Sequence, residues 1–246
     1  MKTLLAGSSS SFRDPIENKT LDLPSLFLQL APTGVSALEA VGAHFANLSE
    51  SYLDQLRSQS QLTHIAIRSL DIRNDLAWPD ASERSRQLGD LCSWMDVART
   101  LDVPLLHLRT GALHPDVSSS QARQWVHDAL ESLLDPARER TRRLALDDGS
   151  GIFDPLDLDR LLRSLDPADD HPTLGLSVEL SALDTQPVDR VFHVRAPLED
   201  GAEPFRSLVD RLRRLGPLSQ TTPVVLEYHG KRDPAQVLAE IVGSLG

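Results

Sequence analysis

Three carboxylates each close a short apolar run of the sequence. Asp147 ends the run LALD, Glu179 ends LSVE and Glu227 ends VVLE. Carboxylates that are held close together repel one another and raise each other's pKa unless a cation lies among them. If the three runs are strands that end on one side of a sheet, the sequence therefore predicts an acidic site, where a divalent cation such as Mn²⁺, Mg²⁺ or Zn²⁺ could bind.

Other polar side chains at candidate strand ends could bind a small ligand. His107 and Arg109 alternate to the same side of one candidate strand, and His193 and Arg195 do so on another. The Arg109 guanidinium could hold a phosphate or a carboxylate, or form a structural salt bridge. Asp75 could bind a substrate hydroxyl or stabilise a turn. The candidate ligand-binding residues are Glu39, Asp75, His107, Arg109, His193 and Arg195.

Short strand-like runs alternate with amphipathic stretches along the whole chain. The predicted strands are Thr3–Ser8, Ser36–Val41, Thr63–Leu70, Leu105–Arg109, Arg143–Asp147, Thr173–Leu180, Arg190–Arg195 and Val224–Glu227. The predicted helices lie near residues 22–31, 49–59, 80–101, 119–134, 155–165, 203–215 and 233–244. The stretch from Ser181 to Pro187 is too short for a helix of normal length.

Eight such units in 246 residues predict a single (β/α)₈ TIM barrel domain over residues 1–246, with a shortened sixth crossover. A doubly wound sheet would favour a glycine-rich loop after its first strand, and LAGSSS at 5–10 has one glycine. In a barrel the carboxyl ends of the strands carry function. The polar residues named above are therefore expected at the barrel mouth.

Several single residues carry more local predictions. Asp80, three residues before Glu83, is a helix-capping signal, and Asp233-Pro234 opens the last helix in a similar way. His64 is placed within the third strand. Trp94 is interpreted as a packing residue on a helix, whereas Trp78 could line the barrel mouth.

Composition excludes several classes of protein. The formal net charge of −11 opposes attachment to nucleic acid, and no apolar stretch approaches the length of a membrane span, about 18 residues. Cys92 is the only cysteine, so an internal disulfide is excluded and a reducing compartment is indicated. With only a short apolar run after Lys2, no secretory signal is expected. These features predict a cytoplasmic protein.

Residues 69–111, SLDIRNDLAWPDASERSRQLGDLCSWMDVARTLDVPLLHLRTG, resemble the bacterial sugar phosphate isomerase/epimerase family of xylose isomerase-like TIM barrels. The shared features are an Asn-Asp pair after the third strand, a long helix that begins near an acidic residue, and a following strand that closes on Gly111. Residues 34–59 are similar to the family's second strand, with its terminal Glu, and to the helix after it. Leu101-Asp102 departs from the family's usual Leu-Gly turn.

The resemblance implies a divalent metal held by a Glu, an Asp, a His and a Glu after strands five to eight. Asp147 stands in place of the first Glu, Glu179 in place of the Asp, and Glu227 keeps the last carboxylate. Arg195 replaces the His, while His193 lies two residues earlier. Because a guanidinium is permanently charged, Arg195 cannot ligate a metal.

Two functional hypotheses follow. In the first, the chain is a divergent, metal-free barrel whose acidic pocket binds a sugar- or polyol-like ligand, with Arg195 paired to Glu179 or Glu227 in place of the metal. In the second, it is an active metal-dependent sugar isomerase or epimerase. Asp147, Glu179 and Glu227 would then hold the metal, and Asp147 and Glu227 would also transfer protons.

A third class, the DNA-repair endonucleases of the related barrel type, would need further histidines at strand ends and a basic face. His107, His114, His193 and His229 do not form that pattern, and the net charge has the wrong sign. The resemblance is also compatible with a homodimer. No helix in the sequence singles out an interface.

Overall fold

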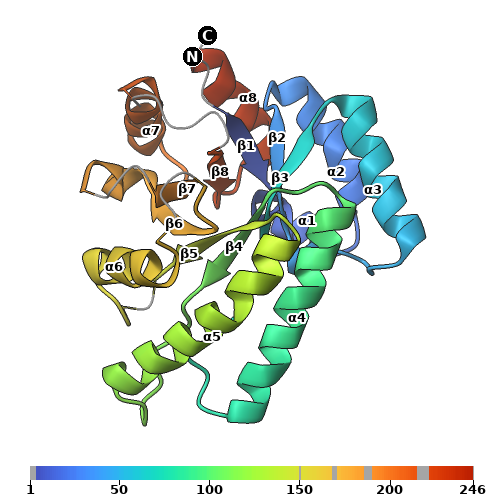
Figure 1. Ribbon diagram of the computed structural model, residues 1–246. Helices are drawn as coiled ribbons and strands as arrows, with labels where there is room; N and C mark the ends of the chain where they lie inside the picture. Colours follow the sequence, from blue (N-terminus) through green and yellow to red (C-terminus); the bar gives the residue numbers. More distant parts are fainter. Residues whose placement is uncertain (1–3, 150, 168–170, 186–189, 215–221, 246) are drawn as a thin grey trace. The chain divides into compact units, whose positions relative to one another are not determined.

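The computed structural model describes residues 4–149, 151–167, 171–185, 190–214 and 222–245. Within them, eight parallel strands follow one another in chain order and form a closed barrel (Figure 1). The strands are β1 (Leu5–Ser8), β2 (Ala37–Val41), β3 (Ala66–Asp71), β4 (Leu105–Arg109), β5 (Arg143–Asp147), β6 (Leu174–Glu179), β7 (Val191–Leu198) and β8 (Val224–Tyr228). This is the (β/α)₈ architecture that the sequence predicts.

Helices connect most of the strands. They are α1 (Arg13–Glu17), α2 (Leu23–Leu30), α3 (Glu50–Thr63), α4 (Ala81–Thr100), α5 (Ser119–Glu139), α6 (Pro155–Leu165), α7 (Ala202–Arg214) and α8 (Pro234–Leu245). Between β6 and β7 the described residues contain only a short 3₁₀ helix, η4 (Leu180–Thr185). The sixth crossover is therefore short, as predicted. No described helix is both long enough and apolar enough to span a membrane.

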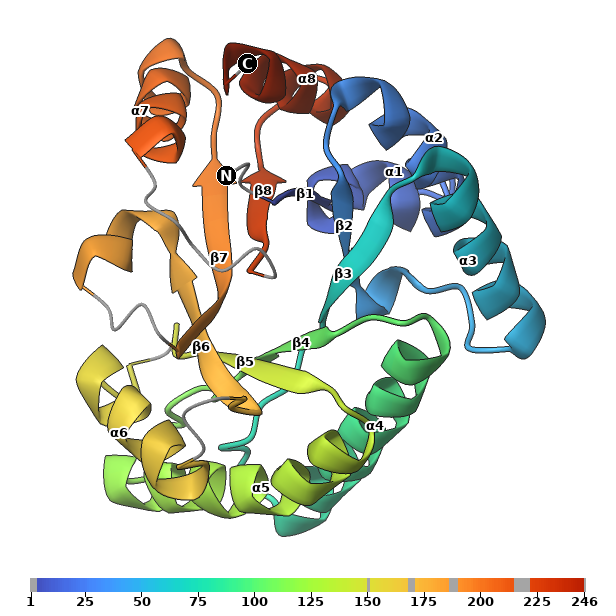
Figure 2. The same ribbon diagram turned by 45° about the horizontal axis from the view of Figure 1, so that its top comes forward.

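The chain divides into two compact units. The first comprises residues 1–70, 178–183 and 193–246. In it β1 pairs with β2 and with β8, and β7 pairs with β8. Helices α2 and α3 pack against each other, as do α7 and α8 (Figure 2). The pairing aligns Ser8, the last residue of β1, with Glu39 in the middle of β2, so these two polar residues lie side by side.

The second unit comprises residues 71–177 and 184–192. In it β4 pairs with β5, β5 pairs with β6, and the long helices α4 and α5 pack side by side. The register aligns Arg109 with Asp147, so the last residues of two neighbouring strands are both polar. Gly111 follows β4 with a φ of +113°, and a side chain at this position would collide with the Asp75 carboxylate. Glycine is therefore required where these two loops meet.

The predicted helix caps are present. The Asp80 carboxylate accepts a hydrogen bond of 2.9 Å from the Glu83 amide at the start of α4, and Asp233 accepts one of 3.0 Å from Ala235 at α8. These bonds satisfy amide groups that have no partner within the first turn of a helix. The capping residues thus set where both helices begin.

Some predicted boundaries are wrong. His64 does not lie in the third strand; it follows the last residue of α3 in the left-handed conformation, with a φ of 57°, and β3 begins at Ala66. Helix α5 continues past the predicted end at 134 to Glu139, with Pro136 inside it. The short helix α1 was not predicted, because its five residues are too few for a periodic pattern. Strand β7 continues past its predicted end at Arg195 to Leu198, so Arg195 lies within the strand and not at its last residue.

Candidate functional site

In the first unit, Glu39 and His193 form a fully buried pair. The His193 Nε2 atom lies 2.6 Å from Glu39 Oε2, and both side chains have 0% exposure. The Ser69 hydroxyl donates a second hydrogen bond, of 2.8 Å, to the same carboxylate oxygen. Hydrogen bonds to a buried carboxylate offset part of the free energy lost when it leaves water. Both residues were predicted to bind ligand, and the contact between them commits one ring nitrogen of His193 to Glu39.

Arg195 and Glu179 form an ion pair in the same unit. The Arg195 Nη2 atom lies 3.6 Å from Glu179 Oε1, with side-chain exposures of 20% and 46%. Glu179 is the last residue of β6. Glu227 is half-buried near the end of β8 and pairs in register with Pro197, two residues beyond Arg195. Arg195 therefore lies beside one of the predicted metal ligands.

In the second unit, His107 lies between two carboxylates. Its Nδ1 is 3.6 Å from Asp71 Oδ1, and its Nε2 is 3.9 Å from Asp147 Oδ2. Arg109 donates to Asp71 at 3.1 Å. His107 and Arg109 both reach Asp71 because side chains two residues apart in a strand share a face. From the sequence alone Asp71 could bind a substrate hydroxyl or stabilise a turn; it is the last residue of β3, and polar alternation at the end of that strand is the signal for its place.

The loop after β3 is held in place by its own polar residues. The Asn74 amide donates to the Arg109 carbonyl at 2.6 Å and accepts from the Arg109 N–H at 3.0 Å. The Asp75 carboxylate accepts from the Ala77 amide at 3.0 Å and lies 2.9 Å from His114 Nε2. Asp75 was predicted to bind ligand or to stabilise a turn. Its contacts with the Ala77 amide and with His114 are those of a residue that stabilises a turn.

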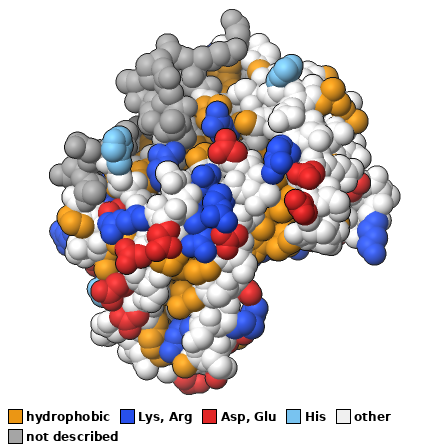
Figure 3. All heavy atoms as spheres, turned by 45° about the vertical axis from the view of Figure 1, so that its right-hand side comes forward, with side chains coloured by type: hydrophobic (Ala, Val, Ile, Leu, Met, Phe, Trp, Pro, Cys, Tyr) orange, Lys and Arg blue, Asp and Glu red, His pale blue; other side chains and the backbone are white. Residues whose placement is uncertain are grey.

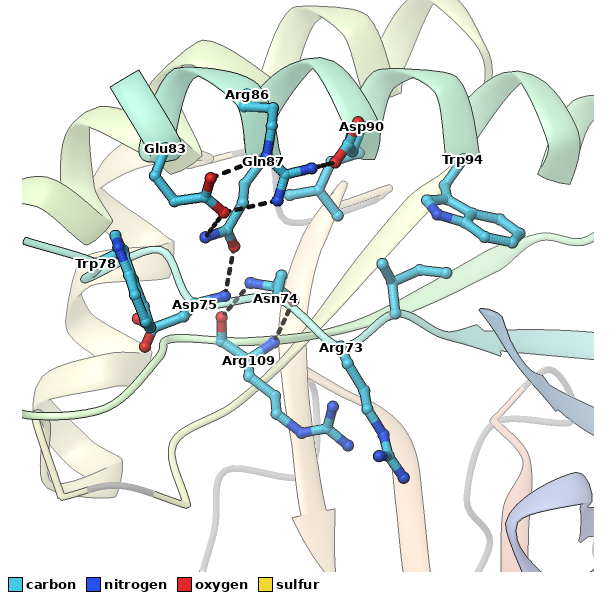
Figure 4. A pocket seen from close by; sticks show the side chains of 12 residues that line it. Arg73, Asn74, Asp75, Trp78, Glu83, Arg86, Gln87, Asp90, Trp94 and Arg109 are labelled. Atoms are coloured by element: carbon cyan, nitrogen blue, oxygen red, sulfur yellow. Dashed lines mark hydrogen bonds and ion pairs between the residues drawn. The ribbon is translucent and has the colours of Figure 1, made fainter. Parts of the chain in front are cut away.

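A cavity of about 640 Å³ opens beside this loop, within the second unit (Figure 4). Its wall combines charged, amide and indole side chains from the β3–α4 loop, helix α4 and the end of β4. The lining residues are Ile72, Arg73, Asn74, Asp75, Trp78, Glu83, Arg86, Gln87, Asp90, Leu91, Trp94 and Arg109. Trp78, which the sequence suggested could line the barrel mouth, lines this cavity. Trp94 was expected to be a packing residue, but it is half-buried and lines the cavity wall.

The end of β8 carries a polar contact that the sequence interpretation missed. The Tyr228 hydroxyl donates to Asp200, and the Lys231 amide donates to the other oxygen of that carboxylate at 2.8 Å. The Tyr228 hydroxyl hydrogen bond and the Lys231 amide lower the pKa of Asp200. Burial, followed by the bond to Asp200, raises the pKa of Tyr228. The contact joins the loop after β7 to the end of β8.

The three carboxylates that were predicted to cluster are divided between the two units. Asp147 belongs to the second unit, whereas Glu179 and Glu227 belong to the first. Each of the three lies at or next to the end of its strand. Their assembly into one metal site stays a prediction.

On the face shown in Figure 3, basic and acidic side chains are interspersed.

Neither a scan against family models nor a search of curated proteins finds a match to this chain. Solved structures do match its fold. Over 99% of both chains it is similar to 3-keto-D-glucoside 4-epimerase YcjR from E. coli, with a TM-score of 0.72 and 15% identity. It also matches, over 100% of both chains, a xylose isomerase-like TIM barrel protein from Mycobacterium smegmatis in complex with magnesium, with a TM-score of 0.69 and 17% identity.

A third similar structure is a xylose isomerase-like TIM barrel/4-hydroxyphenylpyruvate dioxygenase fusion protein, with a TM-score of 0.72 and 19% identity. The chain spans 42% of the length of that fusion protein. At these identities the similarity concerns the fold. The chain therefore has the fold of the xylose isomerase-like TIM barrels.

Proposed function

We propose that this chain is a divergent xylose isomerase-like barrel that binds a small sugar- or polyol-like ligand and does without the divalent metal of its metal-binding structural neighbours. One observation carries the proposal, which is the ion pair between Arg195 and Glu179 at 3.6 Å. A guanidinium supplies beside Glu179 the positive charge that a cation would otherwise supply. Arg195 cannot itself ligate a metal, and its permanent charge repels one.

The residues of the first unit support this proposal in a second way. His193 is the histidine nearest in sequence to the position of the missing ligand, and its Nε2 lies 2.6 Å from Glu39 Oε2 with 0% of either side chain exposed. To ligate a metal through that nitrogen, His193 would have to break this bond and leave a buried carboxylate without it. With Arg195 beside Glu179 and no histidine at its position, Glu179 and Glu227 do not fit a divalent cation.

The alternative is an active metal-dependent sugar isomerase or epimerase. What favours it is the magnesium bound by one structural neighbour and the carboxylates Asp147, Glu179 and Glu227 at the strand ends. In that case Asp147 and Glu227 would transfer the protons. The metal content of the protein separates the two proposals.

The test is elemental analysis of the purified protein, combined with thermal melts in added Mn²⁺, Mg²⁺ or Zn²⁺. We expect substoichiometric metal and no rise in Tm. A metal that did bind, at 100 times its Kd, would stabilise the fold by about 2.7 kcal/mol and would therefore raise Tm. The variant Arg195→His restores the usual ligand type and is expected to gain a metal-dependent rise in Tm. Arg57 is an exposed arginine on α3, so Arg57→His serves as the control and should show no metal-dependent rise in Tm.

Stoichiometric metal in the wild type that is lost in Glu227→Ala would overturn the metal-free proposal and support the isomerase. The ligand is tested separately, by calorimetric titration with neutral ketoses and polyols. Binding that is weakened in Arg195→Gln, with Arg57→Gln unchanged, would support the proposed site. If no sugar or polyol in the panel bound, the ligand class would be wrong.

A further inference from the structure

We propose that Arg73 and Arg109 form an oxyanion-binding subsite in the cavity of the second unit, and that this cavity takes an acidic sugar derivative. Both residues line the cavity of about 640 Å³ in the second unit. Their side chains extend in the same direction, away from α4 (Figure 4). The sugar part of this inference rests on the function proposed above, but the subsite is argued from the cavity alone.

The acidic side chains that line the cavity are already paired with other groups. Arg86 pairs with both Glu83, at 2.6 Å, and Asp90. The Asp75 carboxylate is used by the Ala77 amide and by His114. The carboxylates of the lining residues are therefore already engaged.

The two remaining cations are less fully compensated. Arg109 has the Asp71 carboxylate at 3.1 Å, while its side chain keeps 34% exposure. Arg73 is exposed and has no hydrogen-bond or ion-pair partner among the described residues. Two guanidinium groups that line one cavity repel each other unless an anion lies near both. An oxyanion would supply that charge, and guanidinium groups bind phosphate and carboxylate through paired hydrogen bonds.

The subsite is held in place before any ligand binds. The Asn74 side chain makes two hydrogen bonds to the backbone of Arg109, and the Ile72 amide donates to the His107 carbonyl at 3.0 Å. These bonds fix the residues that flank Arg73 to the strand that carries Arg109. Gln87 accepts from the Asp75 amide at 2.7 Å and so ties the loop to α4. A preorganised site loses less free energy when it orders around a ligand.

The size and the remaining wall of the cavity suit a small ligand. Its volume of about 640 Å³ falls within the usual range for such sites, about 300–1,000 Å³. Trp78 and Trp94 line it as well, and Figure 4 shows their rings well apart, on either side of the Asn74–Gln87 region. Their indole fluorescence therefore offers a direct signal of binding.

The experiment titrates the protein with inorganic phosphate, D-fructose 6-phosphate, D-gluconate and neutral D-fructose, followed by calorimetry and tryptophan fluorescence. We expect at least one of the two acidic sugars to bind more tightly than D-fructose. Arg73→Gln should weaken binding of that ligand about 10-fold, since a charge-assisted bond is worth about one decade of affinity. It should leave D-fructose unchanged. Arg57→Gln is the matched control, and Arg109→Gln is a second test, although it also removes a partner of Asp71.

The outcomes separate the subsite from the proposed function. If Arg73→Gln weakens the binding of D-fructose 6-phosphate and of inorganic phosphate, the subsite binds phosphate. If it weakens the binding of D-gluconate alone, the subsite binds a carboxylate. If phosphate binds through Arg73 and no sugar binds, the subsite stands and the sugar-binding function fails. If D-fructose binds and neither acidic sugar binds more tightly, the subsite is wrong and the function stands. Equal effects of Arg73→Gln and Arg57→Gln would also overturn the subsite.

Discussion

At the scale of single residues, Glu39 and His193 form a polar pair within the core of the first unit. Both have 0% exposure, lie 2.6 Å apart and come from strands β2 and β7. Their contact spans 154 positions of the sequence. Removing one partner of a buried charged or hydrogen-bonded pair leaves the other without compensation, which costs more free energy than the pair itself contributes.

The variant His193→Ala is therefore expected to lower the free energy of unfolding by about 3 kcal/mol or more. Ser69→Ala removes only a hydroxyl donor to the same carboxylate and should cost about 1 kcal/mol. Urea unfolding of both variants measures the difference. Equal and small effects would contradict the expectation that this buried pair stabilises the fold.

At the scale of elements, the loop after β7 is fastened to the end of β8 by Tyr228 and Asp200. The hydrogen bonds from Tyr228 and from the Lys231 amide lower the pKa of Asp200. A carboxyl group whose pKa is lower in the folded than in the unfolded chain stabilises the fold above its unfolded pKa. This contribution is lost as the pH falls through the folded value.

Tyr228→Phe should accordingly lower the Tm near neutral pH, and the difference from the wild type should shrink as the pH falls below about 4. Tyr52→Phe is a matched control, because the Tyr52 hydroxyl accepts only a backbone N–H, from Ala46, among the hydrogen bonds described. Its effect on Tm should stay nearly constant over the same range. Thermal melts from neutral to acid pH provide the measurement, and parallel curves for the two variants would contradict the prediction.

At the scale of the whole molecule, the expectation of one domain over residues 1–246 is open to a direct test. All three tryptophans, Trp78, Trp94 and Trp125, lie in the second compact unit. Their fluorescence therefore reports the unfolding of that unit, while far-ultraviolet circular dichroism reports helices of both units. A single cooperative domain requires the two signals to change together.

We expect the two urea transitions to coincide in the wild type. In His193→Ala, whose substitution is in the first unit, the fluorescence transition should shift as far as the dichroism transition. Separate midpoints would show that the two units unfold independently. The expected homodimer also stays a prediction, which sedimentation equilibrium can check.

The barrel could be predicted from local sequence patterns. Apolar runs such as Leu105–Arg109 and Arg143–Asp147 end where the structure ends β4 and β5, because burial of a strand on both faces leaves a continuous apolar run. The short sixth crossover and the caps at Asp80 and Asp233 are equally local signals. Periodicity also placed Glu39, His107, Glu179 and Glu227 at or near strand ends.

Which of these residues contact one another could not be predicted from the sequence and emerges from the folded structure. The pairing of His193 with Glu39, of Arg195 with Glu179 and of Arg109 with Asp71 depends on distances between strands far apart in sequence. The cavity lined by Arg73, Arg109 and the two indole rings likewise depends on how the loop after β3 packs against α4. Local pattern sets the element and the face of a residue, whereas its partner is set by packing between elements.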